Sequence, residues 1–127
     1  MTTTTFRRTA AATLLATAAL GGLAAPAQAD DFKYVAVAYS PVDKLYGYGY
    51  GANQDLAVTN SLYNCGVIAG HCTVAALSPK DGCVVLSTRG TGEEYAGGSA
   101  ATLPLAMRDA QRKLYGSQVK VSYCVKR

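Results

Sequence analysis

The chain has 127 residues, with 12 Lys or Arg and 8 Asp or Glu. Arg7 and Arg8 lie in a segment that we expect to be removed, which leaves a net charge of 10 minus 8, or +2. So small a positive charge, without a cluster of basic residues, is not typical of a nucleic-acid-binding protein, and we exclude that class.

Residues 1–29 have the pattern of a secretory signal peptide. Arg7 and Arg8 precede an apolar run over residues 10–23, and a small-residue cleavage site ends at Ala29. The run is shorter than the roughly 20 residues that span a bilayer. We therefore expect cleavage after Ala29 and secretion of a single domain, residues 30–127, without a transmembrane segment. An uncleaved membrane anchor is the alternative.

Residues 34–40 alternate as a strand that is apolar on both faces, and Pro41 opens a turn after it. Residues 46–51 alternate Tyr and Gly, which predicts the second strand of a β-hairpin. Since side chains of a strand alternate between its faces, the tyrosines share one face and the glycines the other. We interpret the bare face as room for a helix to pack closely or for the strand to bend sharply.

Asn53 is placed to cap a helix over residues 54–65, and Gly66 is a typical helix end. A strand over residues 71–78 follows. A turn that contains Pro79 and Gly82 then leads to the second half of the chain.

The second half matches the first at a shift of 49 residues, which superposes Tyr46 on Tyr95 and Asn53 on Thr102. It contains, in order, strand 83–89, loop 90–93, strand 94–98, helix 103–115, a stop at Gly116 and strand 118–125. The sequence thus predicts an α+β fold of two pseudo-symmetric β-β-α-β repeats, residues 34–78 and 83–127. We expect them to form a mainly antiparallel six-stranded sheet with both helices on one face.

The chain has four cysteines, Cys65, Cys72, Cys83 and Cys124. An even number in an exported domain indicates two disulfides, for which three pairings exist. We favour Cys65 with Cys72, which joins a helix end to the next strand, and Cys83 with Cys124, which joins two strands. The spacing lacks the Cys-x2-Cys knuckle of a zinc site, so we expect no metal and no cofactor.

The residues that carry a family resemblance are the hairpin opening at 35–40, the Tyr/Gly strand, Asn64-Cys65-Gly66 with Cys72, Gly82-Cys83 and the helical segment 106–110. With these features the chain resembles the exported bacterial family called domain of unknown function 4189, common in mycobacteria and related actinobacteria. The resemblance supports secretion and the cysteine pairing and implies no catalytic residue. Glu93 and Glu94 at the second hairpin depart from the usual pattern.

Side chains that could carry catalysis are few. His71 and Cys72 are neighbours on an expected strand and would point to opposite faces, and an oxidised Cys72 is no nucleophile. Glu93 and Glu94 are adjacent in a polar turn, whereas glycoside hydrolysis needs two carboxyl groups facing one bond. We therefore expect no enzymatic activity; a small hydrolase stays an alternative.

Three further motifs have a structural explanation. Ser87 and Thr88 lack the context of a serine hydrolase, and residues 90–92 lack the lysine and helix of a phosphate-binding loop. Arg108, Arg112 and Lys113 could contact anionic lipid or an acidic partner, but Asp109 among them favours a solvated helix face.

Tyr46, Tyr48 and Tyr50, with Tyr95 from the second repeat, form the candidate binding surface. Tyrosine is enriched at binding sites, although one side of a packed or dimeric sheet would explain the same pattern. We interpret the protein as a non-enzymatic binding protein for an unknown protein or cell-envelope partner. The alternatives are a secreted inhibitor or immunity-type protein acting on an exported enzyme, and a homodimer that buries the tyrosines.

Overall fold

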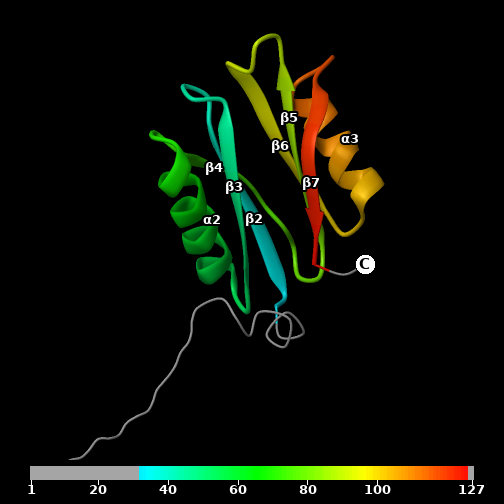
Figure 1. The fold of residues 1–127 in the computed structure, drawn as a ribbon. Coiled ribbons are helices and arrows are strands. Elements are labelled where there is room, and N and C mark those ends of the chain that lie inside the picture. The colour runs from blue at the N-terminus through cyan, green and yellow to red at the C-terminus, as the bar shows by residue number, and fades with distance from the viewer. Residues whose placement is uncertain (1–31, 126–127) are drawn as a thin grey trace, which may run out of the picture. The chain divides into compact units, whose positions relative to one another are not determined.

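The computed structural model describes residues 32–125, so the expected signal peptide lies outside the described residues. Figure 1 shows the arrangement of the elements. Along the chain these are β2 (Tyr34–Ser40), β3 (Leu45–Gly51), α2 (Gln54–Ile68), β4 (Thr73–Leu77), β5 (Cys83–Arg89), β6 (Glu94–Ala100), α3 (Leu103–Lys113) and β7 (Gln118–Cys124).

The six strands form two antiparallel sheets of three strands each, in the orders β3-β2-β4 and β6-β5-β7. The α+β class and the antiparallel pairing are confirmed, but the expectation of one six-stranded sheet is wrong. The central strands explain the difference, because Val35, Ala36 and Val37 of β2 are all fully buried. A strand that is buried on both faces needs a layer on each side, which a single sheet with helices on one face does not supply.

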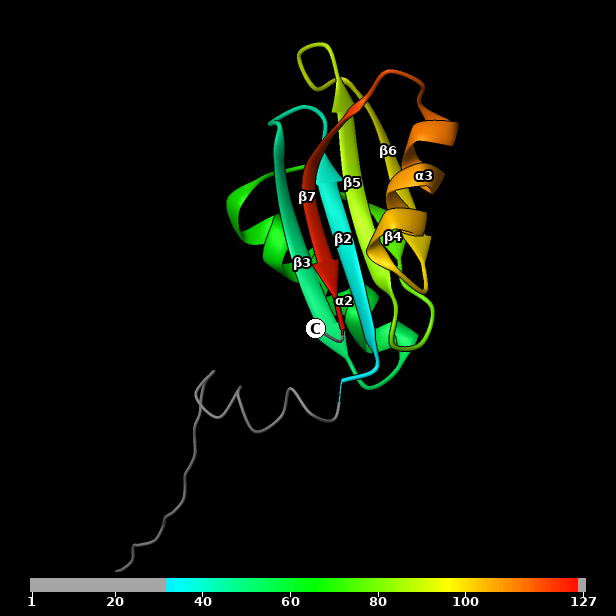
Figure 2. The same ribbon diagram turned by 90° about the vertical axis from the view of Figure 1, so that its right-hand side faces the viewer.

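The two sheets pack face to face, and each carries its helix on its outer face (Figures 1 and 2). The core between the sheets consists of the buried residues Val35, Val37, Tyr39, Ala76, Val84 and Leu86. A second core lies between β5 and α3 and contains Val85, Ala106 and Ala110. The expectation that both helices cover one face is therefore wrong.

The glycines of β3 set the distance between this strand and α2. A Cβ atom at Gly49 would lie 2.5 Å from Cβ of Asn60 and 2.5 Å from the backbone N of Ser61. Gly47 and Gly51 face the same helix, and Gly98 of β6 faces α3 in the same way. The interpretation of the bare strand face as a close contact with a helix is confirmed.

The helix boundaries differ in part from the sequence expectation. Asn53 caps α2, since its Oδ1 accepts from the backbone N–H of Leu56 at 2.9 Å. Gly66, however, lies inside α2, and the helix ends where the Ala69 N–H donates to Cys65. Thr102 occupies the N-cap position of α3 without a side-chain bond to the helix.

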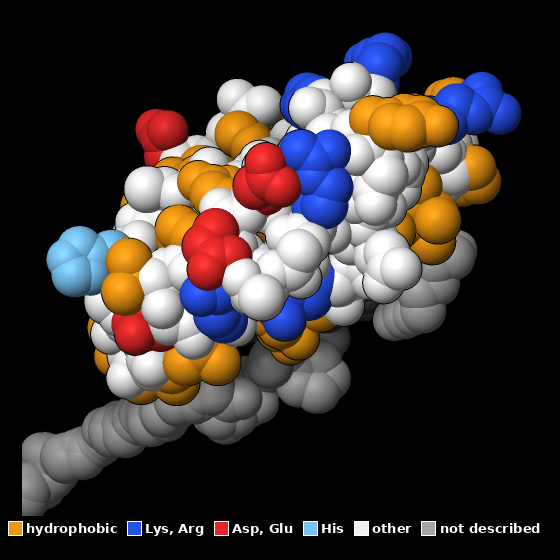
Figure 3. Space-filling model, turned by 90° about the horizontal axis from the view of Figure 1, so that it is seen from above, with side chains coloured by type: hydrophobic (Ala, Val, Ile, Leu, Met, Phe, Trp, Pro, Cys, Tyr) orange, Lys and Arg blue, Asp and Glu red, His pale blue; other side chains and the backbone are white. Residues whose placement is uncertain are grey.

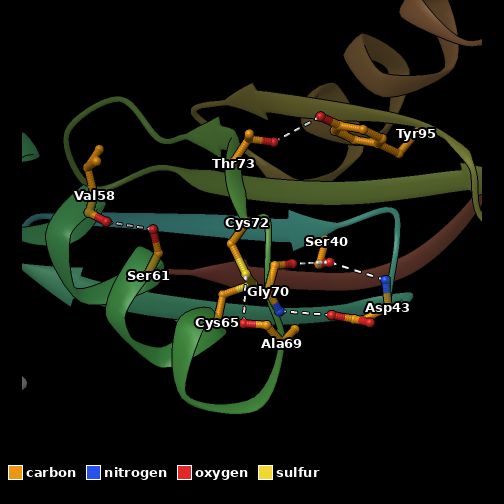
Figure 4. Close-up of a disulfide and its surroundings, with 10 residues drawn as sticks. All are labelled: Ser40, Asp43, Val58, Ser61, Cys65, Ala69, Gly70, Cys72, Thr73 and Tyr95. Carbon is orange, nitrogen blue, oxygen red and sulfur yellow. Dashed lines mark hydrogen bonds between the residues drawn. A yellow bond between two sulfur atoms is a disulfide. The ribbon is translucent and has the colours of Figure 1, made fainter.

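Both disulfides connect the expected cysteines, Cys65 with Cys72 and Cys83 with Cys124. The first closes the loop between α2 and β4, and the β2–β3 turn holds this loop (Figure 4). Ser40 Oγ donates to the carbonyl of Gly70 at 2.5 Å, and the Gly70 N–H donates to Asp43 at 2.8 Å. The loop is thus fixed to the first sheet by a covalent bond and two hydrogen bonds.

The two halves have the same element order and the same strand order. The pairing of the central strand with the last strand is irregular after Val37 in the first sheet and after Leu86 in the second, positions that differ by 86 minus 37, or 49. This matches the shift found in the sequence. Descent of the halves from a duplication stays a prediction.

Candidate binding surface

The tyrosines of β3 face the second sheet. Tyr46 and Tyr50 are partly buried against the core between the sheets, whereas Tyr48 is 41% exposed. The ring of Tyr48 stacks on that of Tyr123 in β7, with 4.0 Å between centroids and 20° between planes. β3 and β7 thus meet through aromatic rings at one margin of the two sheets.

Tyr50 extends this aromatic group in two directions. Its ring stacks on Phe32 at 5.8 Å and meets the edge of Tyr48 at 6.0 Å. Its hydroxyl donates to the backbone carbonyl of Cys124 in β7 at 3.4 Å. We call Phe32, Tyr46, Tyr48, Tyr50 and Tyr123 the aromatic margin.

Tyr95 lies elsewhere on the molecule. Its ring packs edge-on against Tyr39 at 5.1 Å, and its hydroxyl is 3.0 Å from Oγ1 of Thr73 in β4 (Figure 4). The opposing strands β4 and β6 come so close at this margin that a Cβ atom at Gly97 would clash with the carbonyl of Ala75. Tyr95 therefore lies at the margin formed by β4 and β6, whereas the β3 tyrosines lie at the margin formed by β3 and β7.

The buried phenols stay uncharged at neutral pH. Burial raises the pKa of Tyr123 strongly, and a hydrogen bond with Tyr46 and the proximity of Tyr48 and Tyr50 raise it further. Burial also raises the pKa of Tyr39, whose hydroxyl donates to the carbonyl of Gly92 at 2.9 Å. Tyr123 thus contributes an uncharged phenol to the aromatic margin.

Sequence reasoning missed two members of the aromatic margin, Phe32 and Tyr123. Tyr123 alternates with Val121 and Val125, and all three pack against the core between the sheets. This period of two was visible in the sequence and could have placed Tyr123 on the inner face. Phe32 precedes the first strand, and no pattern marks it.

A family model for a domain of unknown function, DUF4189, matches residues 34–125. The chain belongs to the DUF4189 family. Comparisons with curated proteins and with solved structures gave no match. Family membership confirms the resemblance and assigns no activity.

In this DUF4189 domain the carboxylates of the second hairpin form ion pairs. Glu94 accepts two bonds from Arg89, at 2.9 and 3.0 Å, and Glu93 lies 3.7 Å from Nζ of Lys44. The hydrogen bond from Arg89 lowers the pKa of Glu94, and a hydrogen bond from Thr91 lowers that of Glu93. Figure 3 shows acidic side chains next to basic ones at the end of the molecule that carries the β5–β6 turn.

The other catalytic candidates of the DUF4189 domain have these positions. Cys72 is bonded to Cys65, and the neighbouring His71 is exposed with a left-handed backbone, φ 60°. Ser87 is fully buried. Gly90 and Gly92 have φ values of 68° and 101°, which suits the tight turn between β5 and β6.

The basic residues of α3 are partly neutralised within the helix. Asp109 lies 2.5 Å from Arg112 and 3.2 Å from Lys113. Within residues 32–125, no group of His, Cys, Asp and Glu side chains could hold a metal ion. No helix in this part of the chain is long and apolar enough to cross a membrane.

Proposed function

We propose that this DUF4189 protein is a secreted, non-enzymatic binding protein that recognises a protein partner through the aromatic margin. The observation that carries the proposal is Tyr48, which stacks on Tyr123 and is nevertheless 41% exposed. A ring that is held in place on one side and open on the other offers contact area at a low cost in conformational entropy.

The two disulfides support the secreted location. Both join cysteines in the described part of the chain, where no cysteine is left free. Disulfides form and persist in oxidising compartments and are rare in the cytosol. A scaffold stapled in this way suits a small protein that works outside the cell.

The ion pairs of the turn carboxylates support the non-enzymatic reading. Glu93 and Glu94 each bind a basic side chain, and both have lowered pKa values. A general acid needs a carboxyl group that keeps its proton near neutral pH, which requires a raised pKa. These two residues have the opposite property.

A comparison of two tyrosine variants tests the proposal. The tagged chain is used to capture exported proteins, and each captured partner is then titrated against wild type, Tyr48→Ala and Tyr115→Ala. Tyr115 is 87% exposed and lies outside the aromatic margin, which makes it the matched control. We expect Tyr48→Ala to weaken binding about tenfold or more, as for a hot-spot residue, and Tyr115→Ala to bind as wild type.

Thermal melting must accompany this titration. Tyr48→Ala removes one ring stack and should lower the free energy of unfolding by about 1 to 2 kcal/mol, so that the variant stays folded. Unchanged partner binding by folded Tyr48→Ala would contradict the proposal. A dimer of the chain that this substitution dissociates would also contradict it, because the tyrosines would then be an oligomer contact.

A further inference from the structure

Two of the four outer strand edges of the sheets are occupied by helix side chains. The carbonyl of Gly51 accepts from Lys33 on the β2 side, so the carbonyl of Tyr50 points to the free edge of β3. There Asn60 donates to the carbonyl of Tyr50 at 2.8 Å, and Asn64 donates to that of Tyr48 at 2.6 Å. An added strand would have to displace both amides.

Helix side chains also cover the outer edge of β6. Lys113 of α3 donates to the carbonyl of Gly97 at 2.9 Å, and the N–H of Ser99 donates to Asp109 at 3.1 Å. These helix positions lie 49 residues after Asn64 and Asn60. Each half therefore uses its helix to close the outer edge of its hairpin.

The edge of β7 has a different environment. The Cα atoms of Cys83 and Cys124 are 4.0 Å apart, which indicates a pair that exchanges no ladder hydrogen bonds. The peptide groups of Cys124, and those of Ser122 two residues earlier, therefore point away from β5. Tyr50 binds the carbonyl of Cys124, whereas no residue of the described chain pairs with the peptide groups of Ser122.

The open edge of β7 is adjacent to the exposed part of the aromatic margin. Val121 and Tyr123 point inward, toward β3, and Ser122 and Lys120 are exposed. A strand added beside β7 would lie about 4.8 Å further out, since that is the spacing of paired strands. Alternate side chains of such a strand would then reach the open face of Tyr48.

The charge at this edge favours one kind of partner. Lys120 of β7 is exposed here, whereas Lys113 and Asp109 of α3 lie at β6, the opposite edge of the same sheet. No acidic residue of the described chain pairs with Lys120. The unmatched charge is positive, which favours an acidic segment and opposes a second copy of the same edge.

We propose that β7 binds an extended segment of a partner protein by strand addition, and that this segment alternates apolar and acidic residues. The peptide groups of Ser122 would bond the added backbone, apolar side chains would cover Tyr48, and acidic side chains would face Lys120. This inference rests on the proposed function, since it specifies how a partner reaches the aromatic margin.

A blocked synthetic decapeptide that alternates glutamate and valine is the probe. Its dissociation constant is measured with wild type, Ser122→Pro and the matched control Ser122→Thr. Proline removes an N–H that points to the free edge, where the β7–β5 ladder does not need it. We expect Ser122→Pro to weaken binding at least tenfold and Ser122→Thr to bind within about twofold of wild type.

A second variant tests the chemistry of the partner without altering the backbone. Lys120→Glu should weaken the glutamate peptide and favour a matched peptide that carries lysine in place of glutamate. Added salt should weaken the wild-type complex. Amide chemical-shift changes on peptide addition should map to residues 118–124.

Three results would overturn strand addition at β7. One is wild-type affinity in Ser122→Pro with an unchanged melting temperature; another is failure of the glutamate peptide to bind wild type; the third is self-association through β7. A captured partner that requires Tyr48 but tolerates Ser122→Pro would leave the proposed function standing and refute strand addition alone. A partner that tolerates both variants would refute both.

Discussion

Gly49 shows how one missing side chain fixes the distance between a strand and a helix. The backbone of α2 occupies the space that a methyl group at this position would need, with Ser61 N at 2.5 Å. Because the nearest groups belong to the helix itself, the whole element would have to move outward. Alternation in the strand had indicated this close contact as one of two explanations for the bare face, and the structure supports it.

We predict that Gly49→Ala lowers the free energy of unfolding by about 2 to 3 kcal/mol, the range for overpacking a tight contact. Gly66→Ala is the control, since Gly66 lies in α2 and a Cβ atom there has nothing within 4 Å. Alanine at that site should stabilise the chain by about 0.5 to 1 kcal/mol, because it has the higher helix propensity. Urea unfolding of both variants measures the two effects. Equal effects would show that the clash at Gly49 relaxes freely.

Gly66 also shows why local sequence misplaced a helix end. Glycine often ends helices, but here it keeps helical backbone and α2 continues to Ile68. The helix end coincides with the loop that Cys65–Cys72, Ser40 and Asp43 hold in place. Those contacts join residues far apart in the chain, so no pattern within the helix could reveal them.

Asp109 joins α3 to the edge of β6. It accepts from the N–H of Ser99 and pairs with Lys113 and Arg112. Burial raises the pKa of Asp109, but the bond from Ser99 and the pairs with Lys113 and Arg112 outweigh burial and leave this pKa lowered. The charged carboxylate is thus favoured in the folded state.

We predict that part of the stability of the fold is lost in acid through Asp109. A pKa that is lower in the folded than in the unfolded chain gives a contribution that is complete above the unfolded value, about 3.9. The contribution disappears as the pH falls through the lower, folded value. Melting temperatures from about pH 6 to about pH 2 should therefore fall less steeply for Asp109→Asn than for wild type. Parallel profiles would contradict this role.

The elements themselves were largely predictable, whereas their layers were not. Alternation identified the hairpins, and Asn53 marked the start of α2. The apolar character of both faces of residues 34–40 already implied cover on both sides, yet nothing local showed that the second cover is another sheet. Strand periodicity placed the β3 tyrosines on one face of the strand, as the structure has them. Periodicity does not show which element packs against that face, so the contact with Tyr123 of β7 was missed.

The two sheets are connected by the chain between β4 and β5, and neither of the two disulfides joins them. Cys65–Cys72 lies within the first half and Cys83–Cys124 within the second. Contact between the halves depends on the buried apolar core, the aromatic rings and a few polar contacts such as Tyr39 with Gly92 and Lys44 with Glu93. Each disulfide therefore stabilises the half that contains it. Neither disulfide contributes directly to the contact between the two sheets.

We predict that the two disulfides contribute unequally to stability. They join residues 7 and 41 positions apart, and loop entropy assigns about 2.5 and 4 kcal/mol to loops of these lengths. The double variant Cys83→Ala/Cys124→Ala should thus lose more free energy of unfolding than Cys65→Ala/Cys72→Ala. Urea unfolding of both double variants without reductant measures the difference. A larger loss of free energy of unfolding in the Cys65→Ala/Cys72→Ala variant would contradict this prediction. It would show that the hydrogen bonds of Gly70 with Ser40 and Asp43 depend on this disulfide and contribute more than chain entropy.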